Sequence, residues 1–463
     1  MPQETNEFLK PNDELVKFIA TSSGDDTEAP SLTLYLERCQ IDTPPSIVDT
    51  VWQKVLKLRK EIGKAVDFGA GDGRFSLGGK YSQYIGYEID PTRSLIPLSG
   101  TNAQIINRCA FSDTFDDADL SIGNPPYVRN QDLPDGWRNN AAEILKNRLP
   151  NVKISGLANA WQYFFLLSLV STKSDGLIAL VIPFEWVSRP ASASLREYIR
   201  SQRWAVDVYR LKDGAFDNVL TTASITIVDK RVTRDEWNYF DEKDSGDFIK
   251  IPSPSGSDSG VIPYKKSGSS KADPIRFKRG LSPGTQELLL LTETQRINSG
   301  LIQGSDVVPC VKSLRNIDES ITELTPDLFR RLFIETNLKC WLINTDRTPS
   351  KNLAAYLNNV DIRLTQTKTC LEREHWWQFV MPSTPLALIA SGFRGARPKF
   401  VINTVGAKAV GSVCGLHGFS MDAAILIIES FSRLDLSKRV VGHSHGLKKL
   451  EINQLNTILE LIK

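Results

Sequence analysis

The run Asn124-Pro125-Pro126-Tyr127 constrains the fold of this chain more than any other feature of its sequence. It follows residues 119–123, a short apolar segment that is typical of a strand. Two consecutive prolines remove two backbone donors, so neither a strand nor a helix continues through them. We therefore expect a rigid corner that presents the Asn124 amide and the Pro125 carbonyl beside the Tyr127 ring. These groups suit a planar amino group, as on an adenine or an amide. A stiff turn with a packed tyrosine is the alternative.

A glycine-rich loop, residues 67–73 with the sequence DFGAGDG, lies upstream of this corner. Its glycines allow a sharp turn and a close approach of backbone to a ligand. Glu88 ends the next predicted strand, where a carboxylate can accept both hydroxyls of a ribose. The dinucleotide spacing GxGxxG is absent, and Asp67 and Asp72 favour a ligand with a cationic end over a pyrophosphate. The loop therefore indicates S-adenosylmethionine; a glycine-rich connection without a ligand is the alternative.

Short apolar segments alternate with helical ones through the first half of the chain, which predicts a doubly wound, mostly parallel α/β sheet. The composition changes after residue 230, and residues 252–274 are rich in Pro, Ser, Gly and Asp. We expect a polar N-terminal extension at 1–40, a first domain at 41–235, a linker or surface excursion at 236–274 and a mixed α+β domain at 275–463. A chain of 463 residues fits such a division.

Composition excludes several classes of protein. The six cysteines form no CxxC pair, so we expect neither a disulfide framework nor a zinc site, and no metal. No apolar run is long enough to span a membrane and no signal segment is evident, which predicts a cytoplasmic protein without a membrane partner. The net charge of +2 does not by itself indicate nucleic acid, although residues 361–463 hold 13 Lys and Arg against 8 Asp and Glu.

Four segments together carry a more specific signal. Asp42-Thr43-Pro44-Pro45, the glycine loop, Glu88-Ile89-Asp90 and the Asn124–Tyr127 corner occur in this order. Their order and spacing over about residues 40 to 230 resemble those of the gamma-class, Taq-type N6-adenine DNA methyltransferases of restriction-modification systems. The resemblance implies a seven-stranded S-adenosylmethionine-dependent methyltransferase sheet, followed by a C-terminal domain that recognises the target sequence.

The resemblance also implies a cofactor site. Glu88 would hold the ribose and Ile89 would pack on the cofactor's adenine. The acid that usually follows the third strand falls at Ala110 in this sequence, so either Asp113 takes its place or Phe111 packs on the adenine instead. The predicted cofactor-binding residues are Thr43, Pro44, Asp67, Gly69, Gly71, Gly73, Glu88, Ile89, Phe111 and Asp113.

The predicted chemistry is direct methyl transfer to N6 of a flipped-out adenine. An adenine inside a duplex cannot reach a donor in a cleft, and stacking on aromatic rings offsets the unstacking. Tyr127 would supply one face and, by resemblance, Phe216 the other; a core position is the alternative for Phe216. Acceptors at Asn124 and Pro125 would orient the amine, so that positioning and electrostatics carry the catalysis. The predicted catalytic residues are Asn124, Pro125, Pro126, Tyr127 and Phe216.

The C-terminal region is expected to contact double-stranded DNA through Arg, Lys and aromatic side chains. The candidate residues are Lys278, Arg279, Trp376, Arg394, Arg397 and Lys399. We expect a monomer on DNA, in a prokaryotic cell, with a cognate restriction endonuclease as a separate protein. An RNA adenine methyltransferase, a protein glutamine-N5 methyltransferase and a catalytically silent DNA-binding subunit are the alternatives.

Overall fold

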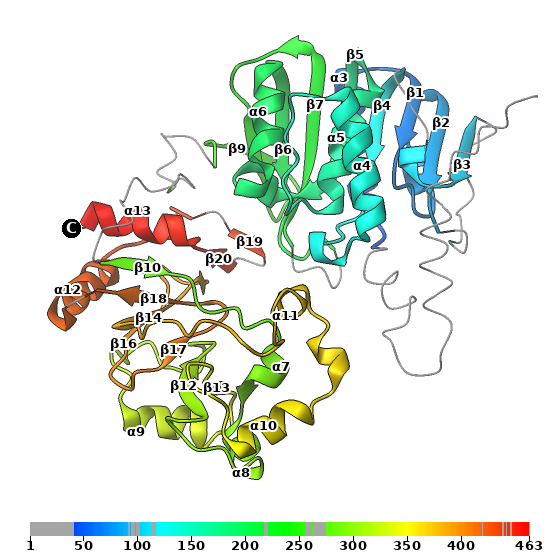
Figure 1. The fold of residues 1–463 in the computed structure, drawn as a ribbon. Helices are drawn as coiled ribbons and strands as arrows, with labels where there is room; N and C mark the ends of the chain where they lie inside the picture. The colour runs from blue at the N-terminus through cyan, green and yellow to red at the C-terminus, as the bar shows by residue number, and fades with distance from the viewer. Residues whose placement is uncertain are drawn as a thin grey trace, which may run out of the picture. The chain divides into compact units, whose positions relative to one another are not determined.

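The computed structural model describes residues 41–90, 93, 98, 102–112, 117–216, 221–254, 262, 275–418, 420–437, 439–440, 442–444 and 447–462. The chain divides into two compact units (Figure 1). The first comprises the chain up to Ser259 together with His443–His445, and the second comprises Gly260–Gly442 and Gly446–Lys463.

A nine-stranded sheet organises the described part of the first unit, in the order β3-β2-β1-β4-β5-β7-β6-β8-β9. The strands β3, β2, β1, β4 and β5 pair in parallel with one another, whereas β7 is antiparallel to both β5 and β6. The expected mixed α/β fold with a large, mostly parallel sheet is confirmed. The strands are β1 (Ile62–Asp67), β2 (Tyr81–Glu88), β3 (Ala103–Asn107), β4 (Ala118–Gly123), β5 (Thr172–Pro183), β6 (Trp204–Arg210), β7 (Ala223–Thr233), β8 (Asn238–Glu242) and β9 (Phe248–Ile251).

Strands β8 and β9 were not expected. A linker or surface excursion was expected at 236–274 and seven strands in the sheet, but β8 pairs with β6 and β9 pairs with β8. The physical reason is apolar packing at this edge. Phe240 stacks on Tyr209 of β6 with ring centroids 4.6 Å apart, and Tyr239 is buried. The first unit therefore extends past residue 235.

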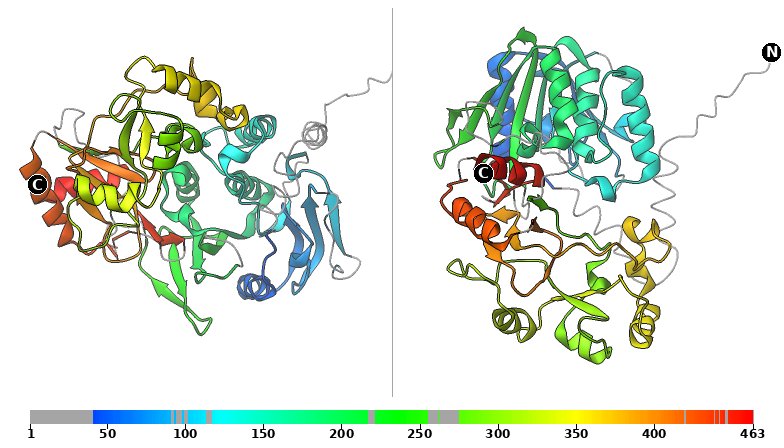
Figure 2. Two further views of the ribbon diagram at one scale, coloured as in Figure 1. Left: turned by 90° about the horizontal axis from the view of Figure 1, so that it is seen from below. Right: turned by 60° about the vertical axis from the view of Figure 1, so that its left-hand side comes forward.

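Helices cover both faces of this sheet. Helix α3 (Pro45–Leu58) begins with a proline in its first turn and packs Val51 and Trp52 into the same core cluster as the inner residues of β5. Helices α4 (Asp135–Arg148) and α5 (Ala160–Ser171) lie on the other face (cyan in Figure 2). Helix α5 contacts β4 and β5 and is buried nearly all round, as its apolar sequence requires. The shorter helices are α6 (Ala193–Ser201) and the 3-10 turns η1 (Arg74–Ser76), η2 (Ala110–Ser112), η3 (Asn130–Asp132), η4 (Phe184–Val187) and η5 (Pro190–Ser192).

The second unit mixes short strands and helices. One four-stranded sheet has the order β10-β18-β14-β16 and another has the order β11-β13-β12-β17. Its strands are β10 (Arg276–Lys278), β11 (Leu290–Leu291), β12 (Val307–Val311), β13 (Trp341–Ile343), β14 (Ala387–Ala390), β15 (Gly392–Phe393), β16 (Phe400–Ile402), β17 (Lys408–Ala409), β18 (Val413–His417) and β20 (Leu447–Lys449); β19 spans Gly442–Ser444.

The helices of the second unit are short, and side-chain caps begin several of them. Ser350 caps α10 and Ser420 caps α12, each by accepting a backbone N–H of the first turn. The helices are α7 (Gln286–Leu289), α8 (Glu293–Asn298), α9 (Pro326–Phe329), the π-helical turn Arg330–Ile334, α10 (Lys351–Asn358), η8 (Ile362–Thr365), α11 (Lys368–Leu371), α12 (Met421–Ser432) and α13 (Ile452–Ile462). None of the helices that the structure describes has both the length and the apolarity needed to cross a membrane.

Candidate functional site

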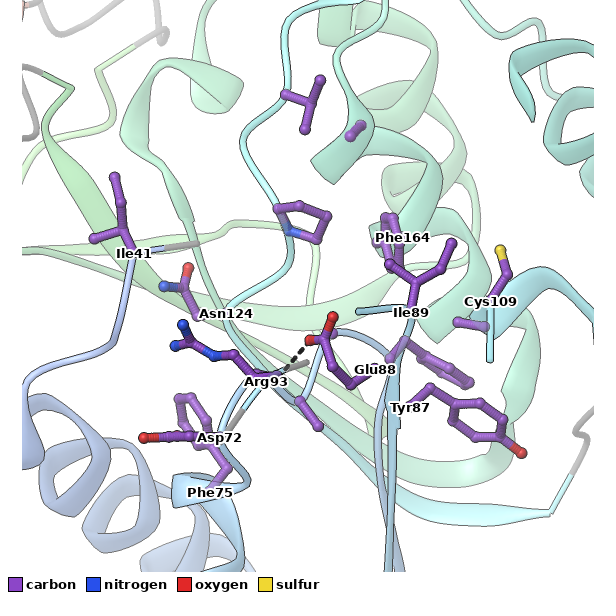
Figure 3. Close-up of a pocket in the computed structure, with 18 of the residues that line it drawn as sticks. Ile41, Asp72, Phe75, Tyr87, Glu88, Ile89, Arg93, Cys109, Asn124 and Phe164 are labelled. Atoms are coloured by element: carbon purple, nitrogen blue, oxygen red, sulfur yellow. Dashed lines mark hydrogen bonds between the residues drawn. The ribbon is translucent and has the colours of Figure 1, made fainter. Parts of the chain in front are cut away.

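A cavity of about 200 Å³ lies where β1, β2 and β4 end, beside the glycine-rich loop. The carboxyl ends of parallel strands are the usual ligand position in such sheets. Figure 3 shows Glu88, Arg93 and Asn124 near its centre and Ile89 and Phe164 on one side. Its lining also includes Ile41, Asp42, Thr43, Phe68, Gly69, Ala70, Gly71, Asp72, Arg74, Phe75, Tyr87, Arg108, Cys109, Ala110, Pro126, Val128, Leu133, Pro134, Trp137 and Ala160.

The glycine loop holds the Glu88 carboxylate in place. Gly71 has a φ of +58°, which favours glycine, and its N–H donates to Glu88 Oε2 at 2.9 Å. The backbone N–H of Asp90 donates to Oε1, also at 2.9 Å. Burial is the main influence on this carboxyl and raises the pKa of Glu88. Each carboxylate oxygen keeps further acceptor capacity, so Glu88 can still bind hydroxyl donors of a ligand.

Asp67 was predicted to bind the cofactor, but it lies elsewhere. It is buried and does not line the cavity. Its Oδ1 accepts the Gly69 N–H at 3.1 Å and its Oδ2 accepts the Tyr84 hydroxyl at 3.0 Å. Burial raises the pKa of Asp67 to about 7. Asp67 therefore positions the loop from beneath and is not placed to touch a ligand in the cavity.

The proline corner packs directly on the glycine loop. A Cβ added at Gly69 would lie 3.2 Å from Pro126 Cδ and 3.5 Å from Pro125 Cα, and a Cβ at Gly123 would lie 2.2 Å from Asp67 Oδ1. Gly123 has a φ of +146°. Glycine at these two positions thus lets motifs that are far apart in the sequence meet.

Asn124 lines the cavity with an unsatisfied acceptor. Its Oδ1 is buried and finds no hydrogen-bond partner in the described part of the chain. Tyr127 follows three residues later and donates its hydroxyl to the Val181 carbonyl at 2.9 Å, while burial raises the pKa of its phenol. Of the corner residues, Asn124 and Pro126 line the cavity, and Pro125 and Tyr127 do not. An unpaired buried acceptor is costly unless a ligand satisfies it.

Charged side chains join the Thr-Pro-Pro segment to the glycine loop at the rim. Arg74 pairs with Asp72 and Asp42, and its guanidinium also donates to the carbonyl of Thr43. Arg93 pairs with Asp42. The expected attraction of Asp67 and Asp72 for a cationic ligand is therefore not supported, because Asp67 lies beneath the cavity and Asp72 is neutralised by Arg74. Pro44 precedes α3 and does not line the cavity.

Aromatic side chains form an apolar wall that the sequence revealed only in part. Ile89 lines the cavity as predicted, together with Phe164 and Trp137. Phe111, 2% exposed, lies behind them, edge-on to Trp137 at 5.4 Å and to Phe164 at 5.3 Å between ring centroids. The sequence did not distinguish Phe164 from its neighbours, because α5 is apolar on every side. Trp137 is the one aromatic residue of α4, a largely polar helix that follows Pro134. An aromatic side chain in such a helix could have identified Trp137 as a candidate from the sequence.

Two further predicted residues do not join this site. Phe216 is 6% exposed and packs with Leu211 and Ala223 in the core; it does not line the cavity that Asn124 lines, but a separate small hollow beside Thr221. Its position favours the core interpretation over the stacking one. Asp113 lies outside the described residues. Ala110, at the position expected for an acid, lines the cavity without a polar side chain.

Comparison with known proteins agrees with this geometry. Residues 98–215 match the family model of the Eco57I restriction-modification methylase, which includes the Asn124–Tyr127 corner. The matched segment is therefore similar to the domain of a restriction-modification methylase.

Two curated methyltransferases are similar over most of the chain. The Type II methyltransferase M.AccI of Acinetobacter calcoaceticus is 22% identical over 384 residues, which cover 75% of this chain and 69% of that protein. M.XamI of Xanthomonas campestris pv. amaranthicola is 22% identical over 420 residues, 81% of this chain and 75% of that protein. The resemblance to restriction-modification methyltransferases is thereby confirmed.

Two solved restriction-modification enzymes share the fold. The Type IIL enzyme MmeI, solved in complex with DNA, matches with a TM-score of 0.59 and 13% identity over 96% of this chain and 67% of that chain. The Type ISP enzyme LlaGI, solved with a DNA substrate mimic, matches with a TM-score of 0.50 and 11% identity over 94% of this chain. This chain spans 47% of the LlaGI chain.

The predicted DNA-contacting residues of the second unit differ in their availability. Lys278, Arg394 and Arg397 are exposed. Arg279 is exposed but pairs with Glu451 at 2.8 Å. Lys399 is half-buried and donates to the carbonyl of Ile317, and Trp376 packs against the apolar core of the unit. Arg279 and Lys399 already have partners and Trp376 is packed, so these three residues are weaker candidates for DNA contact than the sequence suggested.

Proposed function

We propose that this protein transfers a methyl group from S-adenosylmethionine to N6 of an adenine in double-stranded DNA. The observation that carries the proposal is the buried, unpartnered Asn124 Oδ1 at a cavity that the glycine loop and Glu88 also line. A donor amine on the ligand would satisfy this acceptor. Adenine N6 carries two such N–H groups.

The cavity residues fit S-adenosylmethionine. Glu88 retains acceptor capacity for the ribose hydroxyls, and Ile89, Phe164 and Trp137 offer an apolar wall for the adenine ring. Arg74 and Arg93 at the rim both pair with Asp42, so either would have to exchange this partner to bind the carboxylate of the cofactor. When bound, S-adenosylmethionine supplies an electrophilic methyl group on a sulfonium.

In the proposed catalysis, the protein positions the target amine against the methyl donor. Asn124 Oδ1, with the Pro125 carbonyl, would accept the two N–H groups of N6 and turn its lone pair toward the donor. Tyr127, anchored on Val181, would stack on the flipped base. The adenine would leave the duplex to reach Asn124, beside the part of the cavity that S-adenosylmethionine would fill. No covalent intermediate with the protein is required.

The similarity to a restriction-modification methylase supports a biological setting for the proposed activity. We propose that the enzyme acts as a monomer on duplex DNA in the cytoplasm of a prokaryote, and that it protects DNA from a cognate endonuclease that is a separate protein. The second unit would read the target sequence. The domain similarity to a restriction-modification methylase favours DNA over RNA or a protein glutamine as the substrate.

The test is a transfer assay with radiolabelled S-adenosylmethionine. The purified chain is incubated with unmethylated duplex DNA, duplex RNA or a release-factor protein, and labelled DNA is digested to nucleosides. We expect label in the deoxynucleoside N6-methyldeoxyadenosine, from DNA alone. Label in cytosine, in RNA or in the protein would contradict the proposal.

A further inference from the structure

The edge strand β10 of the second unit carries two cations on one face. Phe277, between them, is fully buried in the core of this unit, so Arg276 and Lys278 extend from the opposite face. Strand β10 pairs antiparallel with β18, and in this register Arg276 lies opposite His417. Three basic side chains therefore share one face at the edge of the sheet.

A fourth basic group and two hydroxyls complete the surface. Lys408 of β17 donates its Nζ to the Pro382 carbonyl at 2.8 Å and to Thr384 Oγ1 at 2.9 Å. The neighbouring Ser383 Oγ lies 3.1 Å from His417 Nδ1. We call Arg276, Lys278, Lys408 and His417 the β10 cationic cluster.

Among the residues that the structure describes, no carboxylate forms an ion pair with this cluster. Within the described ranges, neither Arg276, Lys278 nor Lys408 forms an ion pair, whereas Arg279, the residue after Lys278, pairs with Glu451. Arg276 Nε is buried without a hydrogen-bond partner in the same part of the chain. The exposed Asp346 is the carboxylate whose charge acts on Lys408. The cluster therefore has unused donors and a surplus of positive charge.

The surplus of positive charge affects the protonation of His417. Burial, and then the charges of Lys278, Lys408 and Arg276, lower the pKa of His417 to about 4. The imidazole is thus neutral near neutral pH while three cations surround it. An anion placed among these groups would remove the repulsion and favour the imidazolium.

We propose that the β10 cationic cluster binds a phosphodiester of the DNA backbone and that His417 takes up a proton from solvent when the phosphate binds. The inference rests on the proposed action on DNA. A phosphate offers several acceptor oxygens and full negative charge to the cluster's unused donors. Its contribution to DNA affinity is insensitive to base sequence, because the contact is made to the backbone.

Because a proton is taken up, the affinity of this phosphate contact depends on pH. The pKa of His417 is higher with phosphate bound than without it. The extra affinity is therefore fully present at a pH below the unbound pKa and is lost as the pH rises through the bound pKa. One proton limits the effect to about a tenfold change in dissociation constant per pH unit.

The experiment measures binding of the full chain to a fluorescent duplex that contains its methylation site, over a range of salt and from about pH 5 to about pH 8, which brackets the ordinary histidine pKa. The variants are Lys278→Ala and His417→Gln. Arg330→Gln is the matched control, because Arg330 is an exposed cation of the same unit that already pairs with Asp327. Circular dichroism at each pH establishes that every variant is folded.

We expect Lys278→Ala to weaken binding several-fold and to reduce the slope of log affinity against log salt by about 1. The wild type should bind more tightly as the pH falls, and His417→Gln should lose this dependence while binding about as well as the wild type at high pH. Arg330→Gln should match the wild type throughout.

The inference is overturned if both cluster variants match Arg330→Gln in affinity, salt slope and pH dependence. It is also overturned if duplex RNA shows the pH-linked affinity and duplex DNA does not. A wild type that methylates no DNA would instead refute the proposed function. Methylation by the wild type with unaltered binding by the variants would refute this inference alone.

Discussion

Replacing Asn124 by alanine separates its role in catalysis from any role in stability. The Asn124 Oδ1 is buried without a partner, and leaving a buried acceptor unsatisfied costs about 1–3 kcal/mol in folded proteins. Asn124→Ala removes this cost and loses some packing. We therefore expect the free energy of unfolding to stay within about 1 kcal/mol of the wild-type value or to rise.

Whereas the stability of Asn124→Ala should be unchanged or higher, its rate of methyl transfer should fall. Loss of one preorganised hydrogen-bonding group at a reacting centre commonly reduces kcat by about 10²–10³-fold. We expect at least this loss in single-turnover methylation of duplex DNA, with the dissociation constant of S-adenosylmethionine changed by no more than a few-fold. Urea denaturation, isothermal titration calorimetry and the transfer assay measure the three quantities.

The matched control is Asn238→Ala in the same unit. The Asn238 amide donates to Asp207 Oδ1 at 2.8 Å, so its loss should cost about 1 kcal/mol of stability and leave methylation unchanged. Near-normal turnover by Asn124→Ala would refute the reasoning. So would a marked loss of stability and cofactor binding together, because Asn124 would then be a structural residue.

Three further predictions concern the parts that hold the site. Because burial raises the pKa of Asp67 to about 7, above its unfolded value, wild-type stability should increase as the pH falls through 7, and Asp67→Asn should largely remove this increase in urea titrations at several pH values. Gly123→Ala would place a Cβ 2.2 Å from Asp67 Oδ1 at a φ of +146°, so it should lower the unfolding free energy by about 1–3 kcal/mol, whereas Gly246→Ala, with no atom near its Cβ, should cost less. Phe216→Leu should cost less than about 1.5 kcal/mol and leave methylation within a few-fold if Phe216 is a core residue; a 100-fold loss of methylation at full stability would restore the stacking role.

The sequence identified the groups that local backbone chemistry specifies. The glycines at 69, 71 and 73 widen the range of φ and permit close approach, whereas the two prolines at 125 and 126 fix φ, and these effects act within a few residues. Glu88 and Ile89 follow a strand whose end can be read from the sequence. All of these except Gly73 and Pro125 line the cavity.

Residues whose roles depend on distant partners were misplaced. Asp67 carries the right chemistry for a ligand, but Gly123 and Tyr84 bury it beneath the loop. Phe111 and Phe164 are both aromatic, and only the packing of α4 and α5 decides that Phe164 faces the cavity while Phe111 supports it. Strands β8 and β9 add to the sheet because Phe240 meets Tyr209.

The sequence by itself determined the order of the motifs, the strand–loop–helix alternation and the resemblance to restriction-modification methyltransferases, because these depend on neighbours along the chain. Only the tertiary structure decided which side chains keep an unsatisfied group. Asn124 retains a free acceptor, whereas Arg279 and Lys399 spend their donors on Glu451 and Ile317. The physical reason is that hydrogen bonds and burial are settled by residues that meet only after the chain has folded.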